Sequence, residues 1–284
     1  MIINDRIEHY RAGRSNASAC PAVCERFVFY FSFLVFFAGF GLFFVPASHS
    51  QTRKEVFQPG EELVYKVKYG FIKLGTVVIQ TGQMNPDGTV SMHMRFWTAD
   101  VPFLNVKTNV TDRFDTRGLY LRTFEEHTVN GDDKIDKYMS YDPDSKVITY
   151  SDDQISKRLV QNAEPFDDAV GVLFSMREWS GAVGHKYLFH VRDKGGEKTV
   201  TVNFTNRIES QEVPALDDKE VRSRVLEGTM DMQGSSPLGA DGGFTAYISD
   251  DDAAVPVRID MHIAVGSISL VLDKIKRADW PAAK

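Results

Sequence analysis

The densest groups of side chains that could do chemistry are two runs of carboxylates, Asp152-Asp153 and Asp250-Asp251-Asp252. Acid–base catalysis needs two carboxylates that face one cleft with separated pKa values, and calcium prefers hard oxygen ligands. Both runs lie between predicted strands, where Asp commonly accepts backbone hydrogen bonds in turns. Neither has the spacing of a calcium-binding loop. We expect solvated turns, with a metal site at Asp250, Asp251 and Asp252 as the weaker alternative.

Other catalytic constellations are missing from the sequence. It contains no H-E-x-x-H zinc motif and no G-x-S-x-G nucleophile motif, and no glycine-rich loop is placed to cradle a phosphate. Both cysteines, Cys20 and Cys24, precede residue 27, so the rest of the chain has no thiol nucleophile and no disulfide. We predict no catalytic residue and no cofactor, and we favour a protein that is not an enzyme.

Aromatic side chains support a different kind of site. A curled sheet can hold an apolar ligand on its concave face, although small barrels are often filled by their own side chains. The residues that could line such a face are Tyr65, Tyr69, Phe96 and Tyr247. Arg95 and Trp97 project from the other face of their strand and could form a surface contact, although an exposed pair of this kind is more often incidental.

Composition limits the partners. The chain has 284 residues, a formal net charge of −6 and 43% hydrophobic residues, which is ordinary for a globular protein with a sizeable core. A nucleic-acid surface would need clustered Lys and Arg, and no basic run occurs in the body of the chain. We therefore expect no nucleic-acid partner.

The N-terminal segment predicts export. Residues 27–45 are almost continuously apolar, Arg11, Arg14 and Arg26 precede them, and small residues at Ser48 and Ser50 suit cleavage before Gln51. The apolar run is longer than a typical signal core and approaches the length of a membrane span. Residues 1–50 are thus a signal peptide or a membrane anchor. Residues 51–284 are then exported to the periplasm or the outer-membrane periphery, tethered to the inner membrane if the segment stays.

The exported part has the pattern of an all-β protein. Leu63, Tyr65, Val67 and Tyr69 alternate with mostly charged residues, which predicts a half-buried strand in a hairpin over residues 57–79. Further strands are expected at 90–97, 106–114, 119–127, 134–141, 147–151, 155–160, 185–191, 198–204, 207–212, 221–232, 244–249, 257–264 and 267–275, with a loop at 233–243. One helix is expected at 168–178, capped by Asp167 or Asp168, with one apolar face on the sheet.

These elements predict one domain with a core over residues 57–275. Many short strands with one helix and no βαβ rhythm favour a single antiparallel, strongly curled sheet, as a barrel or half-barrel. A hydrophobic signal or anchor helix precedes it.

Four sets of residues, in this order, carry a resemblance to a known family. They are Gly60-Glu61 with Leu63-x-Tyr65-x-Val67-x-Tyr69 and Gly75; Phe114-Asp115 with Gly118-Leu119; the segment Asp167 to Arg177; and Phe244-x-x-Tyr247-Ile248-Ser249-Asp250-Asp251 with Val255-Pro256-Val257-Arg258-Ile259. Over residues 57–275 the chain resembles the bacterial exported family catalogued as domain of unknown function three-one-zero-eight. The resemblance implies an exported all-β domain with a curled sheet, and it supplies no catalytic residues. The long front segment and the 233–243 loop depart from the pattern.

Three functions remain open on the sequence alone. The first is non-enzymatic binding of a hydrophobic or glycolipid-like ligand, or of a partner protein, in the cell envelope. The second is a structural or assembly factor of the cell surface that uses exposed strand edges. The third is a polysaccharide hydrolase that uses carboxylates. Membrane contact is expected through residues 27–45 if they are not cleaved.

Overall fold

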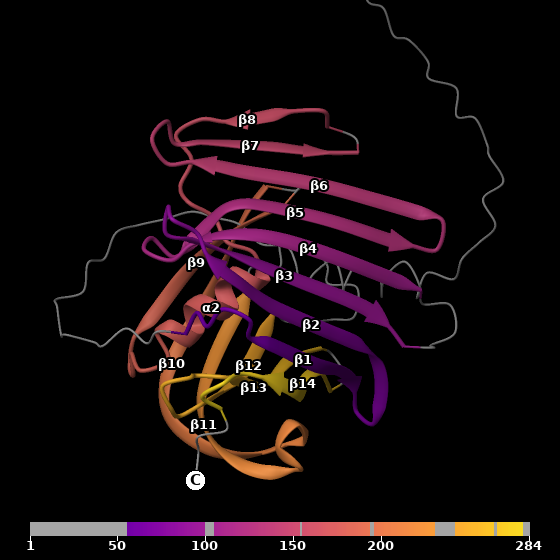
Figure 1. The fold of residues 1–284 in the computed structure, drawn as a ribbon, viewed down its shortest axis with the longest axis vertical. Helices are drawn as coiled ribbons and strands as arrows, with labels where there is room; N and C mark the ends of the chain where they lie inside the picture. Colours follow the sequence, from indigo (N-terminus) through magenta and orange to yellow (C-terminus); the bar gives the residue numbers. More distant parts are fainter. Residues whose placement is uncertain are drawn as a thin grey trace, which may run out of the picture.

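The computed structural model describes residues 56–99, 105–153, 155–193, 196–230, 242–263 and 266–280 (Figure 1). Its elements are β1 (Glu62–Tyr69), β2 (Ile72–Met84), β3 (Thr89–Thr98), β4 (Val106–Asp115), β5 (Tyr120–Asn130), β6 (Asp133–Asp142), β7 (Val147–Asp152), β8 (Arg158–Val160), α2 (Ala169–Glu178), β9 (Lys186–Asp193), β10 (Gly196–Val213), the short 3₁₀ turn η2 (Pro214–Leu216), β11 (Lys219–Met230), β12 (Gly243–Ser249), β13 (Pro256–His262) and β14 (Ser267–Lys276). In this described part of the chain, no helix has the length and hydrophobicity needed to span a bilayer.

All the strands belong to one antiparallel sheet. The 14 strands follow the order β8-β7-β6-β5-β4-β3-β2-β1-β14-β13-β12-β11-β10-β9. β1 pairs with both β2 and β14, so the first and last strands in sequence join the two halves of the sheet. This confirms the prediction of a single antiparallel sheet with one helix. The sheet has two ends, β8 and β9, so it is not a closed barrel, and the strongly curled sheet that was predicted is instead an open, bent sheet.

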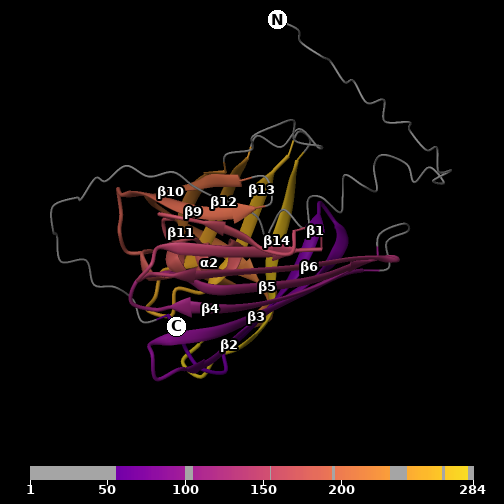
Figure 2. The ribbon, with the colours of Figure 1, turned by 90° about the horizontal axis from the view of Figure 1, so that it is seen from above.

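The sheet bends so that its two halves lie on either side of α2 (Figures 1 and 2). The inner face is apolar because residues of one parity in each strand are buried, as Leu63, Tyr65 and Val67 are in β1. Their neighbours Lys66 and Lys68 take the outer face, where they are partly exposed. The alternation that predicted the hairpin is therefore the alternation that places the core.

Helix α2 is buried all round. Asp168 caps it by accepting a hydrogen bond from the Gly171 N–H at 2.7 Å. Every residue from Val170 to Glu178 is buried, because strands cover the helix on both sides. The expectation of one apolar face on the sheet was therefore wrong: the helix fills the space between the two halves. Phe174 illustrates this packing, since its ring stacks on Phe57 with centroids 5.1 Å apart.

Two further expectations differ from the structure. The strands predicted at 198–204 and 207–212 are one strand, β10, whose pairing with β11 shifts register between Phe204 and Ile208. β8 is only the three residues Arg158–Val160, whereas a strand was expected from residue 155. The predicted helix at 27–45 and most of the 233–243 loop lie outside the described residues.

Candidate functional site

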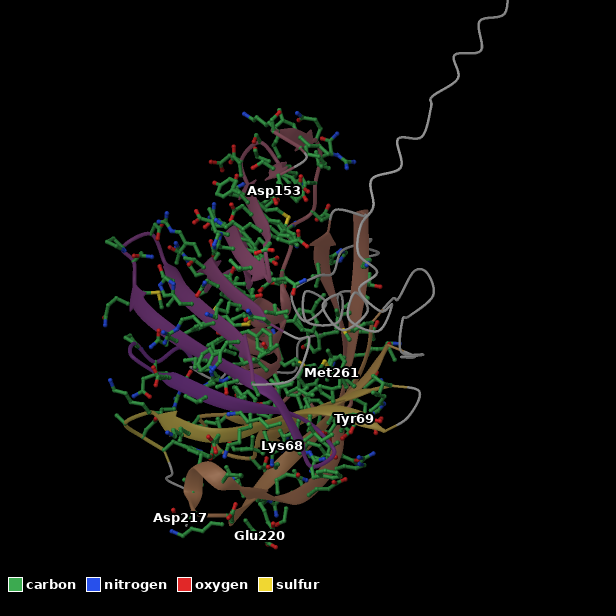
Figure 3. All side chains as sticks on the ribbon, turned by 90° about the vertical axis from the view of Figure 1, so that its right-hand side faces the viewer. Lys68, Tyr69, Asp153, Asp217, Glu220 and Met261 are labelled. Atoms are coloured by element: carbon green, nitrogen blue, oxygen red, sulfur yellow. The ribbon has the colours of Figure 1, made fainter. Side chains whose placement is uncertain are left out.

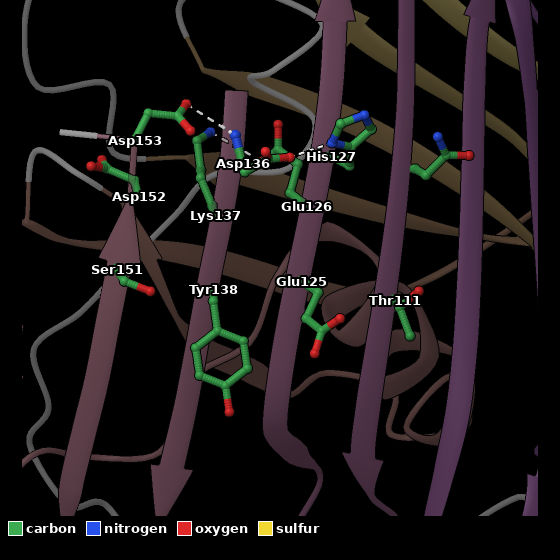
Figure 4. Close-up of a pocket in the computed structure, with 11 residues that line it drawn as sticks. Thr111, Glu125, Glu126, His127, Asp136, Lys137, Tyr138, Ser151, Asp152 and Asp153 are labelled. Carbon is green, nitrogen blue, oxygen red and sulfur yellow. Dashed lines mark hydrogen bonds and ion pairs between the residues drawn. The ribbon is translucent and has the colours of Figure 1, made fainter. Parts of the chain in front are cut away.

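A hollow of about 420 Å³ opens on the outer face of β4, β5, β6 and β7 (Figure 4). We call it the outer groove. Its lining residues are Asn109, Thr111, Glu125, Glu126, His127, Asp136, Lys137, Tyr138, Ser151, Asp152 and Asp153. A volume of this size falls in the range that accommodates small ligands, about 300–1,000 Å³.

Strand register builds the outer groove in two rows. The first row crosses the sheet from Thr111 to Glu125, Tyr138 and Ser151, each the direct cross-strand partner of the next. The second row runs from Asn109 to His127 and Asp136 in the same way. Side chains at directly opposed positions lie about 4.5–5.5 Å apart at Cβ, so each row is a continuous line of polar groups.

Hydrogen bonds fix the second row. His127 Nδ1 forms a hydrogen-bonded pair with Asp136 Oδ1, and both side chains are at least half exposed. The backbone N–H of Asp136 donates to Asp153 Oδ2 at 3.0 Å, which holds that carboxylate at the rim (Figure 4). Next to the first row, His93 Nδ1 lies 3.2 Å from Thr111 Oγ1. The groove thus presents imidazole, carboxylate and hydroxyl groups in set positions.

Two of the residues that line the outer groove, Glu126 and Lys137, belong to a buried polar group within the sheet. Lys137 Nζ donates to Glu126 Oε2 at 3.0 Å, and both side chains are almost fully buried. Thr128 Oγ1 donates to the other Glu126 oxygen at 2.8 Å and lies 2.9 Å from Thr108 Oγ1. This stretch of the sheet is therefore polar on both faces, unlike the apolar inner face of β1.

Three more buried carboxyl groups meet the N-terminus of α2. Asp112 on β4 is 1% exposed, and neither of its oxygens has a hydrogen-bond partner in the described structure. Burial raises the pKa of Asp112 well above its usual range, and the charges of Asp168 and Asp167 raise it further. Burial also raises the pKa of Asp168 to about 6, against the lowering effect of backbone hydrogen bonds from Gly171 and Val170. We call Asp112, Asp167 and Asp168 the carboxyl cluster.

The chemistry available in the outer groove is hydrogen bonding rather than apolar contact. Hydroxyl, amide and carboxylate groups can bind the hydroxyls of a ligand, and the partly exposed Tyr138 offers an aromatic ring. Its exposed carboxylates, Glu125, Asp136 and Asp153, give the groove an excess of negative charge. Within the described ranges, no three or more His, Cys, Asp or Glu side chains are placed to hold a metal ion.

The four aromatic residues predicted to line a ligand site do not converge. Tyr65 is fully buried, with its hydroxyl donating to the Pro256 carbonyl at 2.9 Å, and Phe96 is 2% exposed in the core. Tyr69 is only partly buried, at the end of β1. Tyr247 alternates with buried neighbours in β12, so it points to the opposite face, where it lies under the Arg258 guanidinium.

The predicted carboxylate runs take part in turns and ion pairs. Asp250 accepts hydrogen bonds from Arg222 at 3.0 Å and from Arg224 at 2.6 Å. Asp251 accepts from the Ser249 hydroxyl at 2.8 Å and from the Ala254 N–H at 3.0 Å, while Asp252 is exposed. Of the other run, Asp152 and Asp153 both line the outer groove.

Sequence reasoning missed most of the outer groove, although one signal was present. Asp112 and Glu126 occupy the apolar parity of strands that otherwise alternate cleanly. A carboxylate at a core position breaks the local pattern, and such violations concentrate at functional or strained sites. The Arg95 and Trp97 surface lies beside the groove, since Arg95 is the cross-strand partner of Asn109.

Comparisons with known proteins extend this picture only as far as the fold. A beta-barrel-like protein of domain of unknown function DUF1849 from Brucella abortus is 13% identical, with a TM-score of 0.53 over 78% of this chain and 98% of that chain. A candidate exported protein with a YmcC-like fold from Bacteroides fragilis is 11% identical, with a TM-score of 0.37 over 80% of this chain and 100% of that one. A candidate lipoprotein from Parabacteroides distasonis is 12% identical, with a TM-score of 0.34 at the same coverage.

The family assignment rests on sequence. No curated protein matches the chain. A family model described as "Protein of unknown function (DUF3108)" matches residues 64–273, which is the family that the strand and helix motifs resemble. With most of its length matched, the chain belongs to the DUF3108 family.

Proposed function

We propose that this protein is an exported cell-envelope protein that binds a glycan, such as the sugar part of a glycolipid, in the outer groove without changing it. The observation that carries the proposal is the pair of polar rows across β4 to β7. A sugar needs many directed hydrogen bonds in a small area, and strand register supplies donors and acceptors at regular spacing.

The charge of the outer groove narrows the ligand class. Glu125, Asp136 and Asp153 would repel phosphorylated or carboxylated sugars and would favour neutral sugars or amino sugars. The ring of Tyr138, partly exposed in the first row, offers a flat apolar surface for the face of a sugar ring. We therefore infer a ligand that is uncharged or positively charged.

The inner face is less suited to a ligand. Tyr65 and Phe96, which were expected to line an apolar site, pack in the core, and α2 occupies the space between the halves. We interpret the bent sheet as a half-barrel that is filled by α2. The rigidity of this filled half-barrel keeps the outer rows in register. The apolar part of a glycolipid would then stay outside the protein.

The sequence supports a location outside the inner membrane. The basic residues, apolar run and small residues before Gln51 support export across the inner membrane. We infer that residues 51–284 work in the periplasm or at the outer-membrane periphery, where envelope glycans and glycolipids are found. Retention of residues 27–45 would tether the protein to the inner membrane.

Calorimetric titration of the protein purified from its own cells tests the proposal. The probes are N,N′-diacetylchitobiose, its deacetylated form, and glucose 6-phosphate as the anionic counterpart. We expect binding of one or both of the first two, no binding of the phosphate, and about two- to tenfold weaker binding in His127→Ala, since a typical hydrogen bond contributes about 0.5–1.5 kcal/mol. No binding of either oligosaccharide would contradict the proposal.

A matched control separates local from general effects. His262 is also an exposed histidine on a strand, 3.3 Å from Thr245 Oγ1 on the neighbouring strand, and it lies outside the outer groove. His262→Ala should therefore bind as the wild type does. Mass spectrometry of the same mixtures checks for cleavage: release of a monosaccharide that is lost in Glu125→Gln would replace binding by hydrolysis as the function.

A further inference from the structure

The turn between β1 and β2 exposes large apolar side chains. Phe71 is 97% exposed and the adjacent Ile72 is 45% exposed. Single exposed apolar residues are common, but two consecutive ones at the end of a hairpin form a small projecting apolar tip. We call Phe71 and Ile72, together with Lys68 and Lys73, the hairpin tip.

Positive charge flanks these apolar side chains. Lys68 on β1 and Lys73 on β2 are direct cross-strand partners, although like charges in this arrangement are unfavourable. Lys66, one step further along the same face, pairs with Asp273 at 2.5 Å. Neither Lys68 nor Lys73 has an ion-pair partner among the described residues. Two juxtaposed cations therefore remain available for an external anion.

The tip is held in place by the sheet. β1 is paired on both sides, with β2 and with β14, up to Tyr69. Gly70 makes the turn with a φ of +57°, a conformation that costs glycine little. Tyr69 packs against the hydrophobic core, so the base of the turn is anchored. In Figure 3, Lys68 and Tyr69 lie near Met261 of β13. The exposed apolar side chains are thus presented by a rigid hairpin.

We propose that the hairpin tip inserts Phe71 and Ile72 into the surface of an anionic lipid bilayer, with Lys68 and Lys73 against the headgroups. Apolar and aromatic side chains enter the headgroup boundary while flanking lysines contact anionic lipid. Two apolar residues give too small an area for a specific protein–protein interface, which buries about 1,200–2,000 Å² in total, but they are sufficient for weak, reversible membrane contact.

Insertion of the hairpin tip would then hold the outer groove at a fixed distance from the membrane. In an antiparallel sheet of this order, the β1–β2 and β5–β6 turns lie at the same end. His127 and Asp136 lie near that end, on the two strands of the β5–β6 hairpin. This proposal does not depend on glycan binding, but it would place the groove close to the lipid surface.

Site-specific fluorescence quenching tests the insertion in the full chain with Cys20 and Cys24 replaced by Ser. An environment-sensitive fluorophore is attached in Ile72→Cys, and in Met84→Cys as the matched control. Ile72 and Met84 are 45% and 47% exposed and occupy opposite ends of β2. Vesicles of phosphatidylethanolamine and phosphatidylglycerol carry nitroxide-labelled lipids, and phosphatidylcholine vesicles provide the neutral comparison. Quenching is the readout because residues 27–45, where retained, would bind any bilayer.

We expect a blue shift and strong quenching at position 72, and little of either at position 84. Phe71→Ser should reduce the bilayer-inserted fraction at position 72 by about tenfold or more, since burying a Phe side chain contributes about 1.5–3 kcal/mol. Lys68→Gln and Lys73→Gln should each reduce it about fivefold, on anionic vesicles only. Equal quenching at both positions, or none at 72 on anionic vesicles, would overturn the proposal. So would a concentration-dependent blue shift without vesicles, which would indicate a second copy of the chain.

Discussion

Buried ionisable side chains lie at both ends of α2, but they are paired with opposite charges only at its C-terminal end. At the C-terminal end, Arg177 is fully buried and donates to both Glu61 oxygens at 2.7 and 2.8 Å and to the carbonyls of Ala253 and Ala254. Arg277 adds a further hydrogen bond to Glu61 at 2.8 Å. We call this the arginine clasp. At the N-terminal end, no cation among the described residues pairs with the carboxyl cluster, and both oxygens of Asp112 lack a hydrogen bond.

The difference shows how one helix can be held firmly at one end and respond to pH at the other. The arginine clasp joins Glu61, just before β1, to α2 and to the segment before β13. Burial raises the pKa of Glu61, but the charges and hydrogen bonds of Arg177 and Arg277 outweigh this and hold the pKa below its usual value. The pKa of Asp112 moves in the opposite direction. The two ends therefore contribute opposite pH dependences to the free energy of unfolding.

The largest expected effect comes from breaking the arginine clasp. Arg177→Met leaves Glu61 buried with one fewer cation, and removal of one partner of a buried pair typically costs about 3–5 kcal/mol. We expect a loss of that size in the free energy of unfolding, measured by urea denaturation at pH 7. Arg207→Met is the control, since Arg207 pairs with Glu227 and Glu209 at the surface and should cost at most about 1 kcal/mol. Similar losses in both variants would contradict the clasp.

Removing a charge from the carboxyl cluster should increase the free energy of unfolding, whereas breaking the arginine clasp decreases it. A folded-state pKa that is raised means that the native protein binds more protons than the unfolded chain, so stability falls as pH rises from about 4. Asp112→Asn mimics the protonated carboxyl without taking up a proton, and it should stabilise the protein at pH 7 by about 1–3 kcal/mol, since one pKa unit corresponds to about 1.4 kcal/mol. Urea denaturation at pH 7 and at pH 3.5 should show the difference shrinking at the lower pH. Destabilisation at pH 7 would instead reveal a stabilising partner for the carboxylate.

A smaller effect separates the two roles of Asp168. Its folded-state pKa of about 6 lies above that of the unfolded chain. The free energy of unfolding that depends on Asp168 therefore falls as pH rises from about 4 to about 6, and it falls no further above that pH. Asp168→Asn keeps the helix cap and should remove this slope, whereas Asp168→Ala should also cost about 1 kcal/mol from the lost cap. Denaturation at pH 4, 6 and 8 measures both, and an unchanged slope in Asp168→Asn would assign it to other groups.

Most of the fold could be predicted because it follows from local pattern. Alternating side chains placed nearly every strand, and a cap at Asp167 or Asp168 placed the helix. What local pattern cannot give is the path of the sheet. β1 meets β14 across some 200 residues of sequence, and this pairing determines that α2 is covered on both sides.

The candidate site could not be predicted because it depends on register between strands. Nothing in the sequence distinguishes Asn109, His127 and Asp136 from other polar residues. Only the pairing of β4, β5 and β6 places them in one row. Aromatic residues were a poor guide, since Tyr65 and Phe96 serve the core. A charged residue at core parity, Glu126, was the better signal.

The smallest expected change in the free energy of unfolding comes from the outer groove. It tests whether exposed polar pairs contribute less to stability than the buried clusters do. His127 and Asp136 are 50% and 63% exposed, so water screens their interaction and replaces it when it is lost. His127→Ala should change the free energy of unfolding by less than about 1 kcal/mol at pH 7, measured by urea denaturation beside Arg177→Met. A loss as large as that of the clasp variant would mean that the row supports the fold. A small change leaves the polar rows without a structural reason, because polar side chains that neither stabilise the sheet nor pack in the core are available to hold a ligand.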